Sequence, residues 1–542
     1  MSGGFTGTLR LVRLALRRDR VTLPCWLLGM GVFLAATTAM FDSNYTKHPE
    51  LLALDTRIVV VNPGMRVLGL ATGASSGGYT LHRDGLTLAV LAAVMSILTV
   101  VRHTRQSEEL GREEMLGAGV VGRYASLTAA VVVAVAANVV LAVVLALAMA
   151  LTGQPVGGSL AAGTSIALVG LAFTGLAAVT AQLSSTSRGA TGLASAGIGV
   201  SFMLAALGNM LGAVDSAALR VTSAWPAWLS PIGWGQQVRP FADNRWWPAV
   251  FAVLALGSLF GVAVVLVARR DVGRGLWPER RGSGTASRAL LSPAGLVWRL
   301  QRGALLGWAV ALVGFGLVFG ALSQQIAGLK GAATDWYASF GGNVDLVGAY
   351  WASMTQIAGM AVSIYVVTLL LRLHHDEAQG TLEPVLATAV SRLRWLGAYA
   401  GNALAGATLL MLGFAVAMSI TGGVVLGGFG PLLGDLVGAA LVQLPAIAML
   451  GTAAAAAVLA APRWAAGISW ALAVGSIVVG PMFGPSLGLP SWVQDLSPFT
   501  HVPNAPAVAI SVAPLAGLLV AAALLAAAAV VVLRRRNLVL PA

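Results

Sequence analysis

The sequence predicts an all-α polytopic membrane protein with twelve transmembrane helices in two six-helix halves. Three observations support this fold class. Hydrophobic residues make up 57% of the 542 positions and charged residues only 10%, which is too little charge for a soluble protein of this length. Twelve apolar runs are each long enough to cross the ~30 Å hydrocarbon layer as a helix. One charged motif occurs twice, at matching places between these runs.

The apolar runs fill most of the chain, and each is continuously apolar. A β-barrel is excluded because its strands would alternate apolar and polar residues, so the runs must be helices, which satisfy their own backbone in lipid. In chain order they cover 22–41, 85–102, 124–151, 159–183, 190–213, 247–268, 304–324, 350–372, 397–426, 434–460, 464–484 and 507–533.

Composition excludes several other classes of protein. The single cysteine, Cys25, leaves no internal disulfide or CxxC site, and the six histidines contain no H-x-x-x-H pair, so no metal site is expected. The net charge of +13 lies beside the apolar runs and not in a basic–aromatic motif, so no nucleic acid partner is expected. The 66 glycines suit closely packed transmembrane helices.

The arginines predict the orientation through the positive-inside rule. With the N-terminus inside, the inside segments hold the basic clusters at 10–20, 102–123, 269–302 and 534–536. The outside loops hold fewer basic residues, balanced by acids. Both termini are therefore expected in the cytoplasm. Residues 9–20 and 293–302 are basic and amphipathic, and they are expected to be interfacial helices that contact membrane lipids.

The repeated motif spans residues 108–123 and 377–392. At a constant offset of 269, Glu108, Gly111, Glu114, Val121 and Arg123 match Glu377, Gly380, Glu383, Val390 and Arg392. Leu229-Ser230-Pro231 recurs as Leu496-Ser497-Pro498. The offset between the two basic segments that precede the first span of each half is larger than 269. The difference indicates about 13 extra residues in the first outside loop of the first half. The sequence therefore predicts a first half at 1–268, a cytoplasmic linker at 269–295 and a second half at 296–542, related by a pseudo-twofold axis along the membrane normal.

No energy source is visible in the chain. Neither of the two lysines, Lys47 and Lys330, lies in a G-x-x-x-x-G-K-[ST] nucleotide site. Every acidic residue, including Asp84, is predicted in a loop or at the edge of a span, whereas an ion-coupled carrier usually keeps a carboxylate inside the membrane. The chain is therefore expected to hold no cofactor. A separate ATPase is expected to supply the work, and the two acidic loops are its expected docking sites. The alternative is that each copy of the motif is an ordinary solvated loop. Solvation alone, however, does not require the same residues at the same spacing in both copies.

The motif E-x-x-G-T-L-E-x-x-L-A-T-x-V-S-R of the second copy resembles the coupling-helix loop after span two in permeases of type-two ABC exporters. The segment 229–248, L-S-P-I-G-W-G-Q-Q-V-R-P-F-A-D-N-R-W-W-P, resembles a signature of the actinobacterial polyketide-antibiotic exporter permeases of the tetronasin type. The resemblance covers essentially the whole chain, as a fused double-length permease. It implies the ABCG-like exporter fold in the bacterial cytoplasmic membrane.

The resemblance also implies the partners. Two copies of a separately encoded ATPase would hold ATP and Mg and would contact the chain at the coupling helices. The implied contacts are Glu108, Gly111, Glu114, Arg123, Glu377, Gly380, Glu383 and Arg392, with Arg188 and Arg463 in short inside turns. The first copy departs from the pattern, with Met115 where the second has Pro384 and Gly122 where it has Ser391. Equal coupling by the two loops is therefore in doubt.

By analogy with the family, the substrate path lies between the halves. Methionine and aromatic side chains offer an adaptable apolar surface for hydrophobic drugs, antibiotics or lipids, although ordinary helix packing explains any one of them as well. The candidates are Met95, Phe202, Met203, Asn209, Met210, Met354, Gln356, Met360, Tyr365, Trp470, Met482 and Phe483. Three polar residues, Asn138, Asn402 and Gln443, are expected to bond between helices. The segments 223–246 and 488–506 are expected to re-enter the membrane from outside.

Two other functions stay open at the sequence level. One is an ion-coupled secondary multidrug carrier with two six-span halves, although the 102–123 loop lacks the G-x-x-x-D-R-x-G-R-R pattern that such carriers often place there. The other is a non-transporting ABC-type immunity or sensing subunit, which would bind the ATPase and move nothing.

Overall fold

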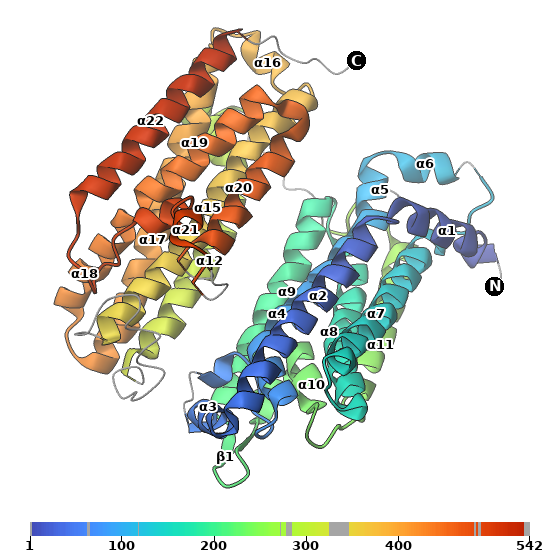
Figure 1. Cartoon of the computed structure of the whole chain (residues 1–542). Helices are drawn as coiled ribbons and strands as arrows, with labels where there is room; N and C mark the ends of the chain where they lie inside the picture. The colour runs from blue at the N-terminus through green and yellow to red at the C-terminus, as the bar shows by residue number, and fades with distance from the viewer. Residues whose placement is uncertain are drawn as a thin grey trace. The chain divides into compact units, whose positions relative to one another are not determined.

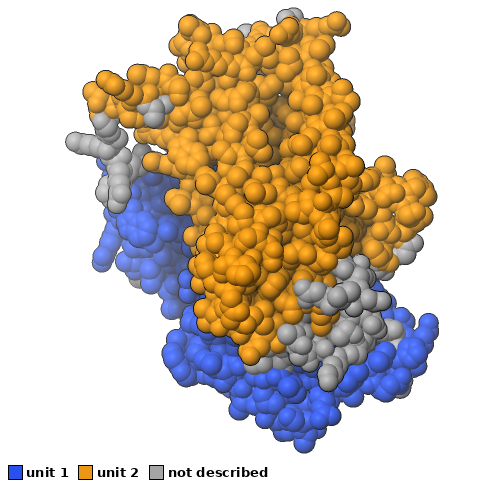
Figure 2. Space-filling view, turned by 90° about the vertical axis from the view of Figure 1, so that its left-hand side faces the viewer, with its two compact units in different colours: residues 1–281 blue, residues 282–542 orange. Residues whose placement is uncertain are grey.

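The computed structural model describes residues 3–61, 65–117, 119–271, 273–277, 284–324, 346–481, 484–485 and 489–535. The chain divides into two compact units, Met1–Arg281 (unit 1) and Gly282–Ala542 (unit 2), which Figure 2 colours separately. The division falls inside the expected linker, and the expected domain limits at 268 and 296 stay predictions.

The described residues contain twelve helices that are long and apolar enough to cross a membrane, which confirms the all-α polytopic fold class. The helices of unit 1 are α1 (Thr8–Arg18), α2 (Thr22–Lys47), α3 (Pro49–Val61), α4 (Ser76–His103), α5 (Arg105–Glu109), α6 (Arg112–Gly117), α7 (Ala125–Leu151), α8 (Val156–Leu183), α9 (Ser187–Met210), α10 (Pro231–Gln237) and α11 (Ala249–Arg269) (Figure 1). Short 3-10 helices lie at η1 (Gly3–Phe5), η2 (Met65–Val67) and η3 (Trp225–Leu229).

The helices of unit 2 are α12 (Pro293–Ala321), α15 (Leu346–Ala378), α16 (Glu383–Leu386), α17 (Arg392–Leu426), α18 (Phe429–Val442), α19 (Leu444–Ala460), α20 (Ala465–Val479), α21 (Ser491–Gln494) and α22 (Val512–Arg535) (Figure 1). The 3-10 helices are η4 (Arg288–Leu291), η5 (Pro462–Trp464) and η6 (Pro498–His501). Helices α18 and α19 together form one candidate span, Phe429–Ala460.

The segment between α2 and α4, which is expected to be the first outside loop, carries structure that the hydropathy pattern does not reveal. It contains α3, which is 13 residues long and lies where the change of offset indicates extra chain. A two-stranded hairpin follows α9, with β1 (Ala213–Asp215) antiparallel to β2 (Arg220–Thr222) and Val214 opposite Val221. Val59, Val60, Leu70, Ala71 and Val221 form a small buried cluster here. This end of unit 1 therefore has its own apolar core.

The two basic amphipathic segments fold differently. Helix α1 is separate from α2 and lies across one end of unit 1, as expected for an interfacial helix (Figure 1). The expected separate helix at 293–302 is wrong, because α12 runs unbroken from Pro293 to Ala321. Ser292 caps its first turn by accepting a hydrogen bond from the N–H of Gly295. Near residue 302, where the interfacial helix was expected to end, only Gly303 is a poor helix former. One glycine inside a helix costs only about 1 kcal/mol, which is too little to end the helix.

Small residues let the helices of unit 1 approach closely. Helix α8 packs against α4, α7 and α11. At Gly163 of α8 a side-chain carbon would lie 2.1 Å from the carbonyl oxygen of Ala142 on α7, so no larger residue fits without moving one of the helices. This is the close backbone approach that transmembrane packing favours.

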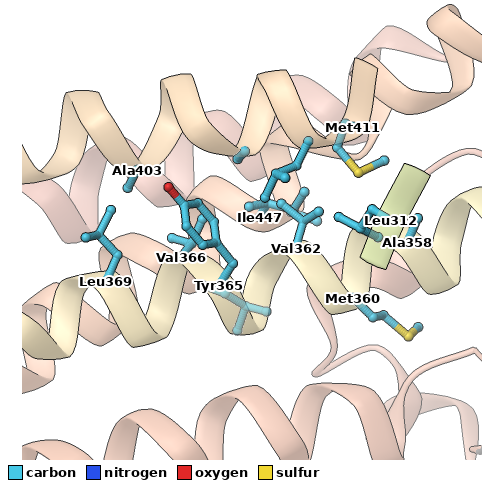
Figure 3. Close-up of a cluster of buried hydrophobic side chains, with 14 of the residues drawn as sticks. Leu312, Ala358, Met360, Val362, Tyr365, Val366, Leu369, Ala403, Met411 and Ile447 are labelled. Carbon is cyan, nitrogen blue, oxygen red and sulfur yellow. The ribbon is translucent and has the colours of Figure 1, made fainter. Parts of the chain in front are cut away.

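The core of unit 2 is built from larger side chains. Leu312 from α12, Met360 and Tyr365 from α15, Met411 from α17 and Ile447 from α19 belong to one buried cluster (Figure 3). Helix α12 packs along α17, with α15 and α19 beside them. The substrate-path candidates on α15 are therefore part of the packing that holds this unit together.

Polar side chains join helices at two of the three expected places. In unit 1 the amide nitrogen of Asn138 donates to Ser96 Oγ on α4 over 2.8 Å. In unit 2 Gln301 on α12 donates to Asn402 Oδ1 over 3.0 Å and accepts from the Tyr365 hydroxyl over 3.1 Å. The expectation is wrong for Gln443, whose buried Oε1 has no hydrogen-bond partner among the described residues.

The recurring Leu-Ser-Pro segments make the same contact in both units. The hydroxyl of Ser230 donates to the carbonyl of Ser201 on α9 over 2.6 Å, and the hydroxyl of Ser497 donates to the carbonyl of Ser476 on α20 over 2.7 Å. Ser201 lies nine residues before the end of α9, about 13 Å along the helix axis. The segment after Ser230 therefore enters the bundle beside α9, as a re-entrant segment would.

Candidate functional site

Both copies of the repeated motif lie at helix ends, and both turn at a glycine. Helices α5 and α6 lie at the same end of unit 1 as α1, and α16 lies at the end of unit 2 that holds the last turns of α22 (Figure 1). Gly111 and Gly380 both have left-handed backbone, with φ of +67° and +71°. Residues with a side chain rarely adopt this conformation, so the matching glycines are explained by the turn that each loop makes.

In the first loop the carboxylate of Glu108 is buried by cations of its own unit. Its side chain is 9% exposed and pairs with Arg105, which is 0% exposed, and Arg270, which is 8% exposed. The Arg105 Nη1 to Glu108 Oε2 distance is 2.8 Å, and the Arg270 Nη1 to Oε2 distance is 2.9 Å. In this conformation the carboxylate of Glu108 is therefore occupied within unit 1, and its expected contact with a soluble partner stays a prediction.

The same arginines tie the first loop to the ends of other helices. Arg105 Nη2 donates to the carbonyl of Ala181 in α8 over 2.7 Å, and Arg270 Nε donates to Gln182 Oε1 over 2.7 Å. Arg123 donates to the carbonyls of Val267 and Arg270 at the end of α11 over 2.9 and 3.0 Å. Arg123 therefore caps a helix end, where a cation is favoured.

Glu109 connects the first loop to the turn that contains Arg188. Its carboxylate accepts hydrogen bonds from the backbone N–H and the hydroxyl of Ser187, over 2.7 and 2.5 Å. An acid at the start of α9 is favoured by the unpaired N–H groups of its first turn. Two expected partner contacts, the first loop and the Arg188 turn, are thus joined by hydrogen bonds.

The second loop is held by a different acid. Asp376, one position before Glu377, accepts a hydrogen bond from the Tyr399 hydroxyl over 2.5 Å. Its backbone carbonyl accepts from the N–H of Leu382 over 3.2 Å. Glu377 and Arg392 both line a small pocket with Leu382, Leu386 and other apolar residues. The two loops are therefore unequal in how they are braced, in line with the differences between their sequences.

Most of the other expected contact residues lie on the surface, either on the two loops or in the turns that contain Arg188 and Arg463. Five of them are exposed at the surface: Glu114, Arg188, Glu383, Arg392 and Arg463. Gly111, Glu377 and Gly380 are half-buried. The structure thus leaves one carboxylate in each loop, Glu114 and Glu383, open to a partner.

The pKa of one loop carboxyl is raised. Burial raises the pKa of Glu113, the hydrogen bond from Ser126 lowers it, and the charge of Glu108 raises it further. The Ser126 Oγ to Glu113 Oε2 distance is 3.0 Å. The neutral form of Glu113 is therefore favoured relative to an exposed glutamate.

Half of the twelve substrate-path candidates are buried in the packing of the protein. Six are buried: Met95, Asn209, Met354, Gln356, Met360 and Tyr365. Phe202 and Met210 are half-buried, and Met203 and Trp470 are exposed. Met482 and Phe483 lie outside the described residues. Asn209 bonds to Gln236 and Ser223, over 2.8 and 2.7 Å, and so holds α10 against α9. A role of any of these residues in a path stays a prediction.

One acid lies inside a helix. Because α4 begins nine residues before the expected span, Asp84 is about 12 Å from the first residue of the helix. Its side chain is buried, and its Oδ2 has no hydrogen-bond partner among the described residues. Asp84 is therefore not in a loop, and its expected place at the edge of a membrane span stays a prediction.

Arg105, Glu109 and Arg270 were missed as parts of the site. Arg105 stands three residues before Glu108, a spacing at which helical side chains meet, so that pair could have been found. The contact with Arg270 joins residues 162 positions apart, and no local pattern predicts it.

Comparison with known proteins identifies relatives of the whole chain. A family model described as "Multidrug efflux system permease Rv1217c, C-terminal domain" matches residues 290–534. Over 522 residues the chain is 38% identical to the multidrug efflux system permease protein Rv1217c of Mycobacterium tuberculosis, covering 95% of this chain and 92% of that protein. Neither description concerns tetronasin, so that resemblance stays a prediction. Identity at this level over nearly the full length shows that the chain belongs to the family of multidrug efflux system permeases.

Proposed function

We propose that this multi-pass membrane protein is the permease subunit of an ATP-driven exporter. It would lie in the cytoplasmic membrane of a bacterium with both termini inside, and two copies of a separate ATPase would dock on its two loops. The observation that carries the proposal is the matched pair of loops. In each unit a left-handed glycine precedes a short helix that presents an exposed carboxylate, Glu114 or Glu383.

The bracing of the first loop suggests how a push there would be transmitted. Arg105 and Arg270 connect α5 to the end of α8, Arg123 connects the end of the loop to α11, and Glu109 connects α5 to α9. A displacement of α5 and α6 would therefore move three helix ends together. In the second unit the N–H of Leu382, just before α16, donates to the carbonyl of Asp376 on α15, and the Tyr399 hydroxyl joins Asp376 to α17. A push at α16 would therefore reach both α15 and α17.

The cargo follows from the relatives and the residue types. The relative from Mycobacterium tuberculosis is named a multidrug efflux permease, so we propose efflux of hydrophobic drugs, polyketide antibiotics of the tetronasin type among them. A lipid cargo would suit the same apolar side chains. ATP and Mg would be bound by the partner, so the permease would catalyse no reaction itself.

The test reverses the exposed carboxylates. Glu114→Arg and Glu383→Arg, made singly and together, should weaken co-purification of the partner ATPase and abolish ATP-dependent uptake of rhodamine 6G into inverted vesicles. Glu50→Arg is the matched control, because Glu50 is also exposed and lies beyond the other end of α2. The proposed export of tetronasin-type antibiotics is tested by measuring tetronasin accumulation in whole cells, which should rise in the double variant.

Full uptake and full ATPase binding by the double variant would contradict the docking assignment. ATPase binding without dye movement in the unmodified protein would favour a non-transporting sensing or immunity subunit.

A second candidate, an ion-coupled carrier, is favoured by one observation, the buried carboxylate of Asp84. Such a carrier would move rhodamine 6G with an imposed pH gradient and no ATP, and Asp84→Asn would stop it. The ATP-driven exporter should keep ATP-dependent uptake in Asp84→Asn and show no movement with the gradient alone.

A further inference from the structure

A groove of about 440 Å³ lies between α1, the first loop and the start of α7. It is at the end of unit 1 that the positive-inside rule predicts to face the cytoplasm. Its apolar wall is formed by Leu11, Leu14, Ala15, Met115 and Ala129, and its polar wall by Arg18, His103, Ser107, Arg112, Glu113 and Ser126.

Four of the six polar side chains already have partners in the protein. His103 Nε2 binds the carboxylate of Asp19 over 2.5 Å, and Ser107 donates to the carbonyl of Arg102 over 3.1 Å. Ser126 donates to Glu113, as described above. The two guanidinium groups, on Arg18 and Arg112, make no hydrogen bond or salt bridge within the described part of the chain.

The two arginines are close enough to repel each other. Burial lowers the pKa of Arg18, and the positive charges of Arg112 and Arg102 lower it further. The neighbouring Asp19 cannot neutralise this pair fully, because its carboxylate is held by Arg102 and His103. An anion between the two guanidiniums would relieve the repulsion, and the planar fork of arginine matches phosphate oxygens two at a time. The raised pKa of Glu113 reduces the opposing negative charge in the groove.

The mouth of the groove is apolar. Leu14 is 53% exposed and Met115 is 71% exposed, although they come from elements about 100 positions apart in the sequence. Helix α1 has further exposed leucines, Leu9 and Leu16, as expected for a helix that lies in the membrane interface. The groove thus joins a site for an anion to a surface suited to hydrocarbon.

We propose that this groove binds one anionic phospholipid, with its phosphate between Arg18 and Arg112 and the upper part of its acyl chains against Leu14 and Met115. The lipid would join α1 to α6. The membrane would therefore contribute directly to the position of the first loop.

The test measures lipid retention by the full-length protein in detergent, using native mass spectrometry. Dioleoyl phosphatidylglycerol should be retained in preference to dioleoyl phosphatidylcholine. Each arginine at an anionic lipid surface contributes enough to change affinity about 5-fold, so R18Q/R112Q should bind phosphatidylglycerol about 30-fold more weakly. R17Q/R20Q removes the same charge from exposed positions beside the groove and should stay within about 2-fold of the unmodified protein.

Equal retention of the two lipids, or equal loss in R17Q/R20Q, would overturn the proposal, as would displacement of phosphatidylglycerol by millimolar inorganic phosphate. Loss of ATPase co-purification by R18Q/R112Q with retention of phosphatidylglycerol unchanged would overturn the proposal and indicate an acidic protein segment in the groove instead. Arg112 is exposed, so R112Q alone should fold even where the double variant does not, and it should show the 5-fold loss.

Discussion

Arg270→Leu tests the buried network that braces the first loop. In the folded protein Arg270 holds both oxygens of Glu108 and donates to Gln182 Oε1. Removing one partner of a buried ion pair costs about 3–5 kcal/mol when the other charge is left uncompensated. Here Arg105 still contacts Glu108 over 2.8 Å, so roughly half of that cost should appear. The lost hydrogen bond to Gln182 adds about 1 kcal/mol. We expect the free energy of unfolding to fall by about 2.5–3.5 kcal/mol.

The assay is denaturation in mixed micelles of mild detergent and SDS, followed by far-UV circular dichroism. Arg269→Leu is the matched control, because Arg269 is the exposed neighbour and should change the free energy of unfolding by less than about 0.5 kcal/mol. In the double variant Glu108→Gln/Arg270→Leu, residue 108 is neutral, so the loss of Arg270 leaves no unpaired carboxylate at that position. It should therefore be more stable than the sum of the single changes by about 1–2 kcal/mol. Strict additivity, or an Arg270→Leu protein as stable as the control, would refute the network reasoning.

Three further predictions concern other parts of the fold. Burial raises the pKa of Asp19, but the hydrogen bond from His103 and the charges of His103, Arg102 and Arg18 outweigh it and hold that pKa below its usual value. The stabilisation of the fold by the Asp19 carboxylate is therefore fully present above about pH 4 and is lost as the pH falls through the lowered pKa. Limited proteolysis between pH 3 and 7 should show α1 becoming easier to cleave at the acidic end of this range. Gly111→Val should cost about 1–2 kcal/mol in denaturation because of the left-handed backbone, while Gly111→Asn should cost little; equal costs would contradict this. Asn402→Ala should lower stability in the same assay by about 0.6–1.7 kcal/mol through loss of the Gln301 contact, and an unchanged midpoint would contradict that role.

The sequence predicts the spans well because length and hydropathy are local properties. All twelve apolar runs correspond to candidate spans, although α4 begins nine residues early. The residues before it, from Ser76, lie at the end that carries α3 and the hairpin, where a helix does not need to be apolar. The same early start places Asp84 inside the helix.

The candidate site is less predictable because its bonds depend on tertiary contacts. The repeat locates both loops and both glycines, and the two open carboxylates, Glu114 and Glu383, were among the expected residues. The motif cannot show that Glu108 is enclosed, because the enclosing Arg270 comes from the far end of the same unit. Nor does it show that Asp376, and not Glu377, holds the second loop to Tyr399.

The chain that follows α11 is also bonded to α8. The N–H groups of Leu276 and Trp277 donate to the carbonyls of Gln182 and Leu183 over 3.1 and 3.0 Å, and Leu183 is the last residue of α8. A force applied to the chain beyond Trp277 would therefore act on the end of α8 as well as on α11. The same helix end holds Arg105 and Arg270, so such a force would also reach the first loop.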